Sequence, residues 1–420
     1  MKQAADHINQ LVDHLFRHES GKMVAVLSRL LGLQHLETAQ DIVQDTLLQA
    51  MNTWSYGAVP DNPPAWLHRV ARNKAIDFLR REKRFRTLSP HYAYLLQSEW
   101  TLSPTVNQLF FENEIQDSQL RMIFACCHPA IPEDSRIAFT LKTLCGLSVA
   151  EIARAYLSRE ETIAKRIYRA KEQVRTAHIE LEVPRGDELP GRLDAVLKSL
   201  YLLFNEGYNS SHPDLLIRDD LCAEALRLGY LLSEHPVTNT SRTQALMALL
   251  CFQSSRLAAR LDDKGNIILL KFQDRTKWNR ELITRGFYYL DNATGTNEAS
   301  QYHLEAAIAS LHAAARSFEQ TDWKSIYHLY DALYQREPGP VIALNKAIAS
   351  AYAIGRQHGL DELLQIKGLD DYYLYHASAG EMYLDLDKKE QARVFFEKAL
   401  RLTGSASEQQ LLLEKISRCN

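Results

Sequence analysis

A cationic segment near the start of the chain carries the residue types that bind phosphate and unpaired bases. Residues 66–86 hold eight Lys or Arg and two acidic residues, although the whole 420-residue chain has a formal net charge of −3. Lys and Arg neutralise nucleic-acid phosphates, and the ring of Trp66 offers a flat surface on which a base can stack. For a basic segment taken alone, a solvated helix surface is the plainer alternative.

The spacing of these side chains predicts a helix with two different faces. The face expected to pack against protein holds Leu67, Val70, Ala71, Ala75, Phe78 and Leu79. The opposite, mostly cationic face holds Trp66, Arg69, Asn73, Asp77, Arg80 and Arg84. Such a helix can lie along a nucleic-acid backbone while its apolar side stays buried.

A second basic segment, residues 147–171, has the pattern of a helix-turn-helix. Ser148 and Glu151 have the spacing of a capping box, and a turn is expected near Leu157–Ser158. Ile152, Ala153, Ile163 and Ile167 would face inward. The outward residues of the second helix would be Thr162, Lys165, Arg166, Arg169 and Lys171. These side chains suit base edges and phosphates in a major groove, and an ordinary helical hairpin is the alternative.

Other groups of reactive side chains carry weaker signals. Residues 126–128 read Cys-Cys-His, but no second cluster has the spacing of a metal site, so we expect neither a metal nor a cofactor. Glu206, Asp274, Arg275, His303 and Glu305 have no spacing that demands catalysis. We therefore expect a binding protein and not an enzyme.

The elements that position these residues are predicted to be helical almost throughout. Helical periodicity covers residues 8–31, 36–54, 65–84 and 114–127 and continues to about residue 180. One turn with a short strand is expected at residues 262–270. With six scattered cysteines, no signal peptide and no apolar run of about 18 residues, the sequence favours a cytoplasmic protein without a membrane span.

Breaks in this periodicity divide the chain into four parts. The first domain covers residues 1–88, and residues 89–114, with two Pro, form a flexible linker. A helix-turn-helix domain covers residues 115–182. The Pro- and Gly-rich stretch VPRGDELPG then opens a large helical domain at 183–420. The predicted fold is therefore all-α and multi-domain.

Together these motifs resemble the extracytoplasmic-function (ECF) RNA polymerase sigma factors. DIVQDTLLQAMNTW (41–54) and PPAWLHRVARNKAIDFLRREKR (63–84) are similar to region 2 of that family. The second motif is specific, because it fixes an aromatic, an amide and an acid at set positions. Residues 135–175 are similar to region 4. The two matches come in the family's order, with little chain between them.

The resemblance implies a role for each set of residues. The partners would be core RNA polymerase, through its β′ clamp and β flap, and promoter DNA. Asp41, Gln44, Asp45 and Leu48 would bind the polymerase. Asn62, Trp66, Arg69, Arg72, Asn73 and Arg80 would meet the −10 element, where a base is flipped out. Asp77 would brace a neighbouring Arg, and the outward residues of 162–171 would read the −35 element.

The long C-terminal part resembles the sigma-factor group with a tetratricopeptide (TPR)-like extension. Gly380, Tyr383, Ala392, Phe396 and Ala399 stand at the small and aromatic positions of that repeat, and a degenerate copy is expected at 341–370. The resemblance implies that the extension regulates or supports the sigma activity. A contact between the extension and the sigma domains within one chain is a separate hypothesis. The group Asp274, Arg275, Lys277 and Trp278 suits interdomain packing, with a small ligand as the alternative.

Two other classes of protein remain as alternatives. A DNA-binding repressor or activator that works without polymerase would have no need of the acidic residues at 41–45. An enzyme or ligand sensor would place its active part in the C-terminal domain and use the DNA-binding half as its readout. A small molecule bound in the extension would favour this second alternative.

Overall fold

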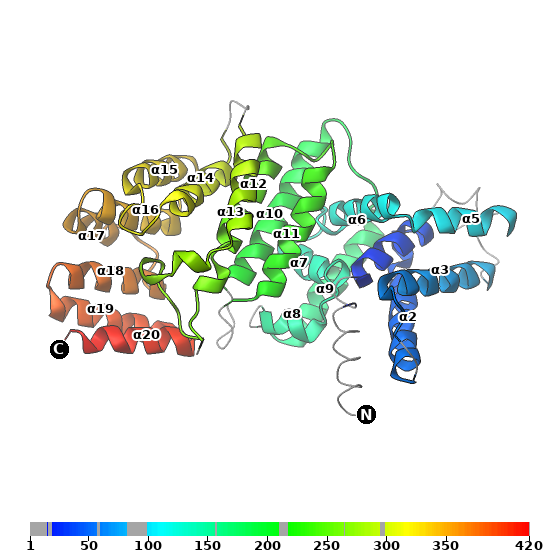
Figure 1. The fold of residues 1–420 in the computed structure, drawn as a ribbon, viewed down its shortest axis with the longest axis horizontal. Helices are drawn as coiled ribbons and strands as arrows, with labels where there is room; N and C mark the ends of the chain where they lie inside the picture. Colours follow the sequence, from blue (N-terminus) through cyan, green and yellow to red (C-terminus); the bar gives the residue numbers. More distant parts are fainter. Residues whose placement is uncertain are drawn as a thin grey trace. The chain divides into compact units, whose positions relative to one another are not determined.

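The computed structural model describes residues 15, 19–56, 59–81, 99–155, 158–209, 217–263, 265–294 and 299–419. The described residues form helices joined by loops, with no β-strand among them, so the all-α prediction is confirmed. Contacts divide the chain into two compact units, Met1–Leu202 and Leu203–Asn420. Figure 1 shows the two units from blue to green and from green to red.

The first unit is built around the helical segment 19–31. Nearly all its side chains are buried, including those of Met23, Leu27 and Leu30. A helix whose side chains are buried on nearly all sides lies inside a core. Gly21 allows a close approach here, because a Cβ at this position would lie 2.0 Å from the backbone oxygen of Leu144. Segment 19–31 therefore packs directly against the residues that precede the helix-turn-helix.

Apart from α5, the remaining described helices of the first unit follow the predicted helical segments. Their bounds are η1 Leu33–His35, α2 Leu36–Tyr56, α3 Pro63–Arg81, α5 Glu99–Leu109, α6 Glu112–Cys126, α7 Glu133–Thr143, α8 Val149–Ala155 and α9 Glu160–Thr176. Arg29 of segment 19–31 forms ion pairs with Glu114 and Asp117 of α6, at 2.8 and 3.0 Å. Segment 19–31 thus contacts α6 near its C-terminal end and the residues after α7 near its N-terminal end.

The boundaries in the structure differ from those predicted at two places. Residues 89–114, expected to be a linker, contain α5 and the start of α6. The helix that follows the Pro- and Gly-rich stretch, α10 (Glu188–Tyr208), spans the division between the units. Its first half is tied to the first unit, because Arg192 donates to the backbone oxygen of Phe124 and Lys198 pairs with Glu133. A cut at residue 183 would therefore remove part of the first unit.

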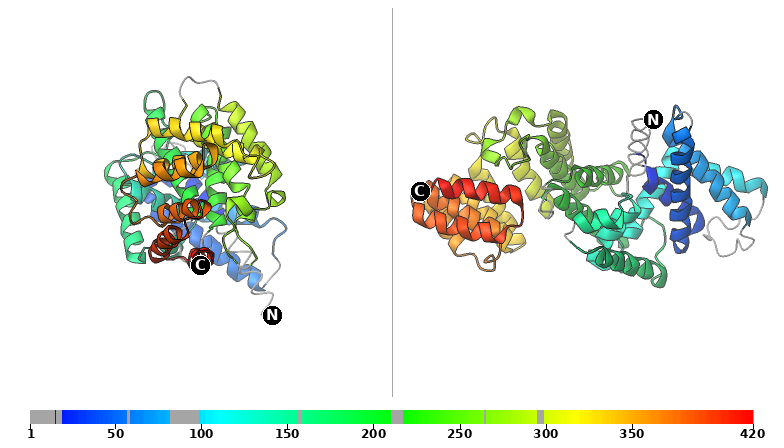
Figure 2. Two further views of the ribbon diagram at one scale, coloured as in Figure 1. Left: turned by 90° about the vertical axis from the view of Figure 1, so that its left-hand side faces the viewer. Right: turned by 90° about the horizontal axis from the view of Figure 1, so that it is seen from below.

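The second unit is a succession of antiparallel helices, which are stacked in layers in Figures 1 and 2. Their bounds are α11 Asp219–Glu234, α12 Ser241–Ser254, α13 Arg280–Asn292, α14 Gln301–Ala314, α15 Trp323–Arg336, α16 Pro340–Ala353, α17 Arg356–Leu364, α18 Tyr373–Asp385, α19 Lys389–Leu402 and α20 Ala406–Ser417. α12 is buried on nearly all sides and packs against α11, α13 and α14.

The repeat-like positions near the end of the chain meet between α18 and α19. Gly380 is buried, and a Cβ there would lie 2.6 Å from ring carbons of Phe396. Ala392 and Ala399 are fully buried in the same cluster, and Tyr383 packs at its edge. Small residues thus let the two helices approach, as the sequence spacing predicted.

The expected strand at 262–270 does not form, and this prediction is wrong. The chain turns around Gly265, and an isolated antiparallel bridge joins Leu261 to Ile267. Asp262 accepts from the backbone nitrogen of Asn266, so a side chain closes the turn. The apolar residues that follow form the short helix η5 (Leu270–Phe272), and none of the described residues forms a strand that could pair with them.

The group at 274–278 packs within the second unit. Arg275 donates to the backbone oxygens of His312 and Ala315 at the end of α14, at 2.5 and 2.7 Å. Its guanidinium also lies 4.8 Å from the ring centroid of Trp278, which is 3% exposed. Asp274 caps the short helix η6 (Arg275–Lys277). These contacts give the group a structural role inside one unit.

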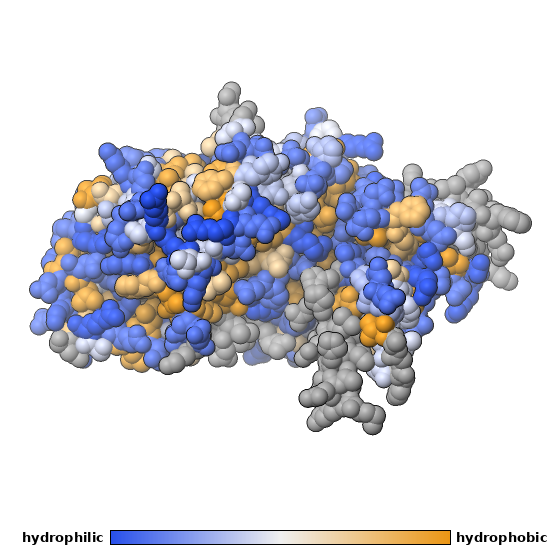
Figure 3. Space-filling view, in the orientation of Figure 1, coloured by the Kyte–Doolittle hydropathy of each residue, from blue (hydrophilic) through white to orange (hydrophobic). Residues whose placement is uncertain are grey.

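Figure 3 shows hydrophobic residues scattered among hydrophilic ones over one face of the molecule. Among the described residues, no helix is long and apolar enough to cross a membrane.

Candidate nucleic-acid interface

The two faces predicted for the basic helix are present in α3. Leu67, Ala71, Ala75 and Leu79 are fully buried, and Val70 and Phe78 are half-buried, so the predicted packing face is confirmed. Arg69, Asn73, Asp77 and Arg80 are exposed on the opposite side. Arg84 lies outside the described residues. The 3.9 Å pair between Asp77 and Arg80 is largely exposed and therefore weak.

The start of α3 is held by its own capping residue. Asn62 Oδ1 accepts from the backbone nitrogen of Ala65 at 3.1 Å, and the Asn62 backbone oxygen accepts from Trp66. This cap satisfies N–H groups that a helix start leaves without partners. The Trp66 ring lies 5.3 Å from that of Trp54 on α2, in a tilted arrangement. Trp54 is buried, so it fixes the position of the half-buried Trp66 ring.

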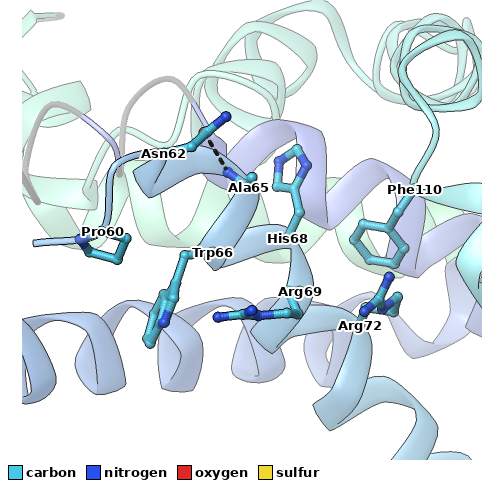
Figure 4. Close-up of a pocket in the computed structure, with 8 residues that line it drawn as sticks. All are labelled: Pro60, Asn62, Ala65, Trp66, His68, Arg69, Arg72 and Phe110. Atoms are coloured by element: carbon cyan, nitrogen blue, oxygen red, sulfur yellow. Dashed lines mark hydrogen bonds between the residues drawn. The ribbon is translucent and has the colours of Figure 1, made fainter.

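A pocket of about 490 Å³ opens beside the first half of α3 (Figure 4). It is lined by Pro60, Asn62, Ala65, Trp66, His68, Arg69, Arg72 and Phe110. The helix contributes residues at steps of three and four along one side, and Phe110 reaches the pocket from the segment that follows α5. The lining offers cationic groups, ring nitrogens and aromatic surfaces but no carboxylate, so it suits an anionic ligand with a flat ring.

A buried ion pair supports the wall of this pocket. His68 Nε2 lies 2.9 Å from Glu19 Oε2, and Lys22 Nζ lies 2.9 Å from the other oxygen of the same carboxyl. Burial alone would raise the pKa of Glu19, but the hydrogen bonds from His68 and Lys22 outweigh it and hold this pKa below its usual value. The charged carboxylate therefore fixes the His68 ring at the pocket.

The predicted recognition helix is α9, and it follows the Ser148–Glu151 capping box. Glu151 Oε2 accepts from the Ser148 backbone nitrogen at 2.7 Å, and Ser148 Oγ accepts from the Glu151 backbone nitrogen at 3.1 Å. Ile152, Ala153, Ile163 and Ile167 are buried, which confirms the predicted inward face. Leu157, at the expected turn, lies outside the described residues.

The five outward residues of this helix differ in their surroundings. Thr162, Lys165 and Arg169 are exposed. Arg166 forms an ion pair with Asp134 of α7 at 3.1 Å. Lys171 lies 3.1 Å from Glu37 and 3.3 Å from Gln40 of α2. Two of the five cationic or polar groups are thus engaged within the unit, and Lys171 joins the recognition helix to α2.

The third predicted surface lies along one side of α2. Asp41, Gln44, Asp45 and Leu48 are all exposed, and Leu48 keeps 48% of its area in solvent. Their spacing places them on a single face, while Ile42, Val43, Leu47 and Ala50 are buried on the other. Met51, 37% exposed, extends the apolar end of this surface. An exposed row of two acids and two apolar side chains fits a protein partner with cationic and apolar groups.

The remaining candidates have packing partners. Cys126 and Cys127 are fully buried, and burial raises the pKa of both thiols. His128 Nδ1 accepts from the backbone nitrogen of Ala130. No cluster of three His, Cys, Asp or Glu in the described ranges could hold a metal ion. His303 closes the capping box at the start of α14, and Glu305 accepts from Gln301.

Sequence reasoning missed His68, Phe110, Met51 and Glu19. His68 stands one residue before Arg69 on the helix, and its place in the pocket follows from helical spacing. Met51 lies three residues after Leu48 and was open to the same argument. Phe110 and Glu19 carry no local signal, because their roles depend on tertiary contacts with α3.

Comparison with known proteins places these surfaces in a family. Residues 15–85 match the model of sigma-70 region 2, and residues 121–174 match that of sigma-70 region 4. The ECF RNA polymerase sigma-E factor of Salmonella typhimurium (strain 14028s / SGSC 2262) is 30% identical over 137 residues, which cover 32% of this chain and 70% of that protein. The chain belongs to the ECF sigma factors. Helix α3 lies in the region-2 match, and α9 lies in the region-4 match except for its last two residues.

The sigma factor has further relatives and an additional C-terminal part. The ECF sigma factor SigE of Mycolicibacterium smegmatis is 27% identical over 165 residues, covering 39% of this chain and 60% of that protein. An uncharacterised protein of Rhizobium meliloti (strain 1021) is 36% identical over 393 residues, covering 93% and 92%. Residues 192–294 match DUF6596, a family of unknown function. No solved structure matches the chain. Its sigma-70 regions imply binding to core RNA polymerase and promoter DNA.

Proposed function

We propose that this sigma factor directs core RNA polymerase to promoters by reading a −10 element with α3 and a −35 element with α9. The main support is the pocket beside α3, where Trp66, Arg69 and Arg72 combine an aromatic surface with two guanidinium groups. That combination favours an unpaired nucleotide, whose base stacks while its phosphate is neutralised. Binding there would favour the opened duplex over the closed one.

The α2 surface would hold the sigma factor on the polymerase. We propose that Asp41, Asp45 and Leu48 contact the β′ clamp and that the region-4 domain contacts the β flap. Leu48 exposes about half of its side chain in the free chain. Removing that half from water on binding would contribute about 1 kcal/mol to the binding free energy, which is roughly a fivefold gain in affinity. The two carboxylates would add electrostatic attraction that weakens with salt.

Recognition of the −35 element would begin with the exposed residues of α9. Thr162, Lys165 and Arg169 are exposed, so they can meet DNA without first leaving a buried site. Arg166 and Lys171 would exchange their carboxylate partners for phosphates or base edges. The carboxylate of the Lys171–Glu37 pair is exposed. Breaking this ion pair would therefore cost less than about 1 kcal/mol of folding free energy.

We propose that the second unit regulates or supports this activity and catalyses no reaction. Its stacked helix pairs, with the TPR-like contact of Gly380 and Phe396, fit a protein-binding role. An intramolecular contact with the sigma regions is the form of regulation that we expect. A chain of residues 1–209, which keeps α10 whole, should differ from the full chain in transcription, and equal behaviour would remove this part of the proposal.

In-vitro transcription tests the central proposal. Purified core polymerase is given the full chain and fragmented host DNA, and new transcripts are mapped by sequencing. We expect defined start sites that need the chain. Asp41→Lys with Asp45→Lys should lower both polymerase binding and transcription, whereas Glu390→Lys, an exposed acid of α19, should change neither. The absence of any start site would refute the proposed function.

A repressor that works without polymerase would not need the α2 surface. The exposed row from Asp41 to Met51 therefore favours the sigma role. Retention of DNA-dependent activity by the double Lys variant, with polymerase binding lost, would instead support the repressor.

A further inference from the structure

The segment that connects the two sigma regions contributes a side chain to the pocket of region 2. Phe110 follows α5 and precedes α6, yet it lines the same pocket as Trp66 and the α3 arginines (Figure 4). Its ring centroid lies 6.0 Å from that of His68, with the two planes tilted by 60°. The Phe110 side chain is only half-buried, so part of its ring remains available inside the pocket.

The shape and chemistry of the pocket assign separate tasks to its two sides. Ala65 has a small side chain that leaves space next to the helix, and Phe110 and Trp66 lie toward different ends of the pocket in Figure 4. Arg69 lies between them, and Arg72 lies next to Phe110 (Figure 4). Arg72 Nε is buried, and no acceptor in the described part of the chain lies within hydrogen-bond distance of it.

We infer that Phe110 stacks on an unpaired base of the −10 strand, so that the connecting segment completes the nucleotide pocket of region 2. This inference rests on the proposed function and deepens it, because it names a base-contacting residue outside the region-2 motif. The Phe110 ring supplies stacking, and the arginines hold the backbone on either side of the stacked base. His68, fixed by Glu19, keeps the Phe110 ring at the edge of the pocket.

With Phe110 in this role, the pocket depends on how the connecting segment packs against region 2. α5 contacts both α3 and α6, so Phe110 sits where the two sigma regions meet through the chain. Capture of the base would therefore be coupled to the position of α5. A pocket formed by region 2 alone would have no such dependence.

The test uses the full chain bound to core polymerase and a fluorescent single-stranded 12-mer. The 12-mer carries the non-template −10 segment of a promoter that the wild-type holoenzyme opens on host DNA. A second set of 12-mers replaces one base at a time by an abasic site, which keeps the phosphates and removes stacking. Binding is measured by fluorescence anisotropy for the wild-type chain, Phe110→Ala, Phe110→Leu and Phe110→Trp.

We expect Phe110→Ala to weaken binding of the intact 12-mer about 5- to 150-fold, the range of one base–aromatic stack of 1–3 kcal/mol. Phe110→Leu, which keeps an apolar side chain of similar size, should lose most of the same affinity, and Phe110→Trp should retain it. At one abasic position the wild type and Phe110→Ala should bind alike, because the base that stacks is already absent. The matched control is Phe111→Ala, since Phe111 is 61% exposed and does not line the pocket.

Different failures can be told apart. If the wild-type holoenzyme opens no promoter, the proposed function itself is refuted. If it opens promoters but Phe110→Ala binds the intact 12-mer as tightly as the wild type, only the role of Phe110 is refuted. Equal losses for Phe110→Ala and Phe111→Ala, or full affinity in Phe110→Leu, would assign Phe110 to packing and also overturn the inference.

Discussion

Replacing Glu19 by Ala should destabilise the first unit more than any exposed ion pair of that unit would. The Glu19 carboxylate is 7% exposed and accepts from His68 and Lys22, each at 2.9 Å. A hydrogen bond to a charged group contributes about 1.5–3 kcal/mol. Water can reach His68 and Lys22 in part, because 17% and 27% of these side chains are exposed. We therefore expect Glu19→Ala to lower the free energy of unfolding by about 2–4 kcal/mol.

Glu37→Ala is the matched control for this change. Glu37 also pairs with a Lys, at 3.1 Å, but its side chain is 79% exposed. Its loss should cost less than about 1 kcal/mol. Both variants remove a carboxylate from the same unit, so the difference between them isolates burial.

The pH dependence gives a second, independent check. The pKa of Glu19 lies below its usual value in the folded chain, so its contribution is present above the unfolded pKa of about 4.3. The contribution is lost as the pH falls through the folded pKa. The difference in stability between the wild type and Glu19→Gln should therefore shrink below about pH 4 and stay constant near neutrality.

Hydrogen exchange with mass spectrometry on the full chain can separate the two units. We expect Glu19→Ala to lower protection in peptides of segment 19–31 and α3, with little change in α18–α20. Equal effects of Glu19→Ala and Glu37→Ala, or a loss below 1 kcal/mol for the first, would refute the reasoning from burial.

Three further predictions concern other parts of the chain. Burial lowers the pKa of His312 to about 3, so the second unit should lose about 1.4 kcal/mol of stability for each pH unit as the pH falls from 6 to 4. Urea unfolding should show this slope in the wild type and in His328→Gln, which changes an exposed histidine. The slope should be absent in His312→Gln. Gly380→Ala should cost about 1–3 kcal/mol by overpacking against an aromatic ring of α19, whereas Gly404→Ala, with open space around it, should melt like the wild type in circular dichroism. Ser148→Ala should cost about 1 kcal/mol and raise hydrogen exchange at the start of α8, and unchanged exchange there would contradict the cap.

The faces of single helices were predictable because they depend on local spacing. A step of three or four residues places Leu67 and Ala71 on one side of α3 and Arg69 and Asn73 on the other, whatever surrounds the helix. The capping box of Ser148 and Glu151 is equally local. Residue types in these patterns also carried the family resemblance, which the comparisons confirm for both sigma regions.

The contacts between helices were decided only by the tertiary structure. Glu19 and His68 are 49 positions apart, and Lys171 and Glu37 are 134 apart, so no sequence window contains both partners. Nothing in the sequence around Phe110 distinguishes it from other residues of the predicted linker, and its place in the pocket depends on the packing of α5 against α3. A strand at 262–270 failed for the same reason, since a strand needs a partner that local residues do not specify. Periodic patterns determine which side of a helix is buried, while the packed core determines which helices meet and which side chains share a pocket.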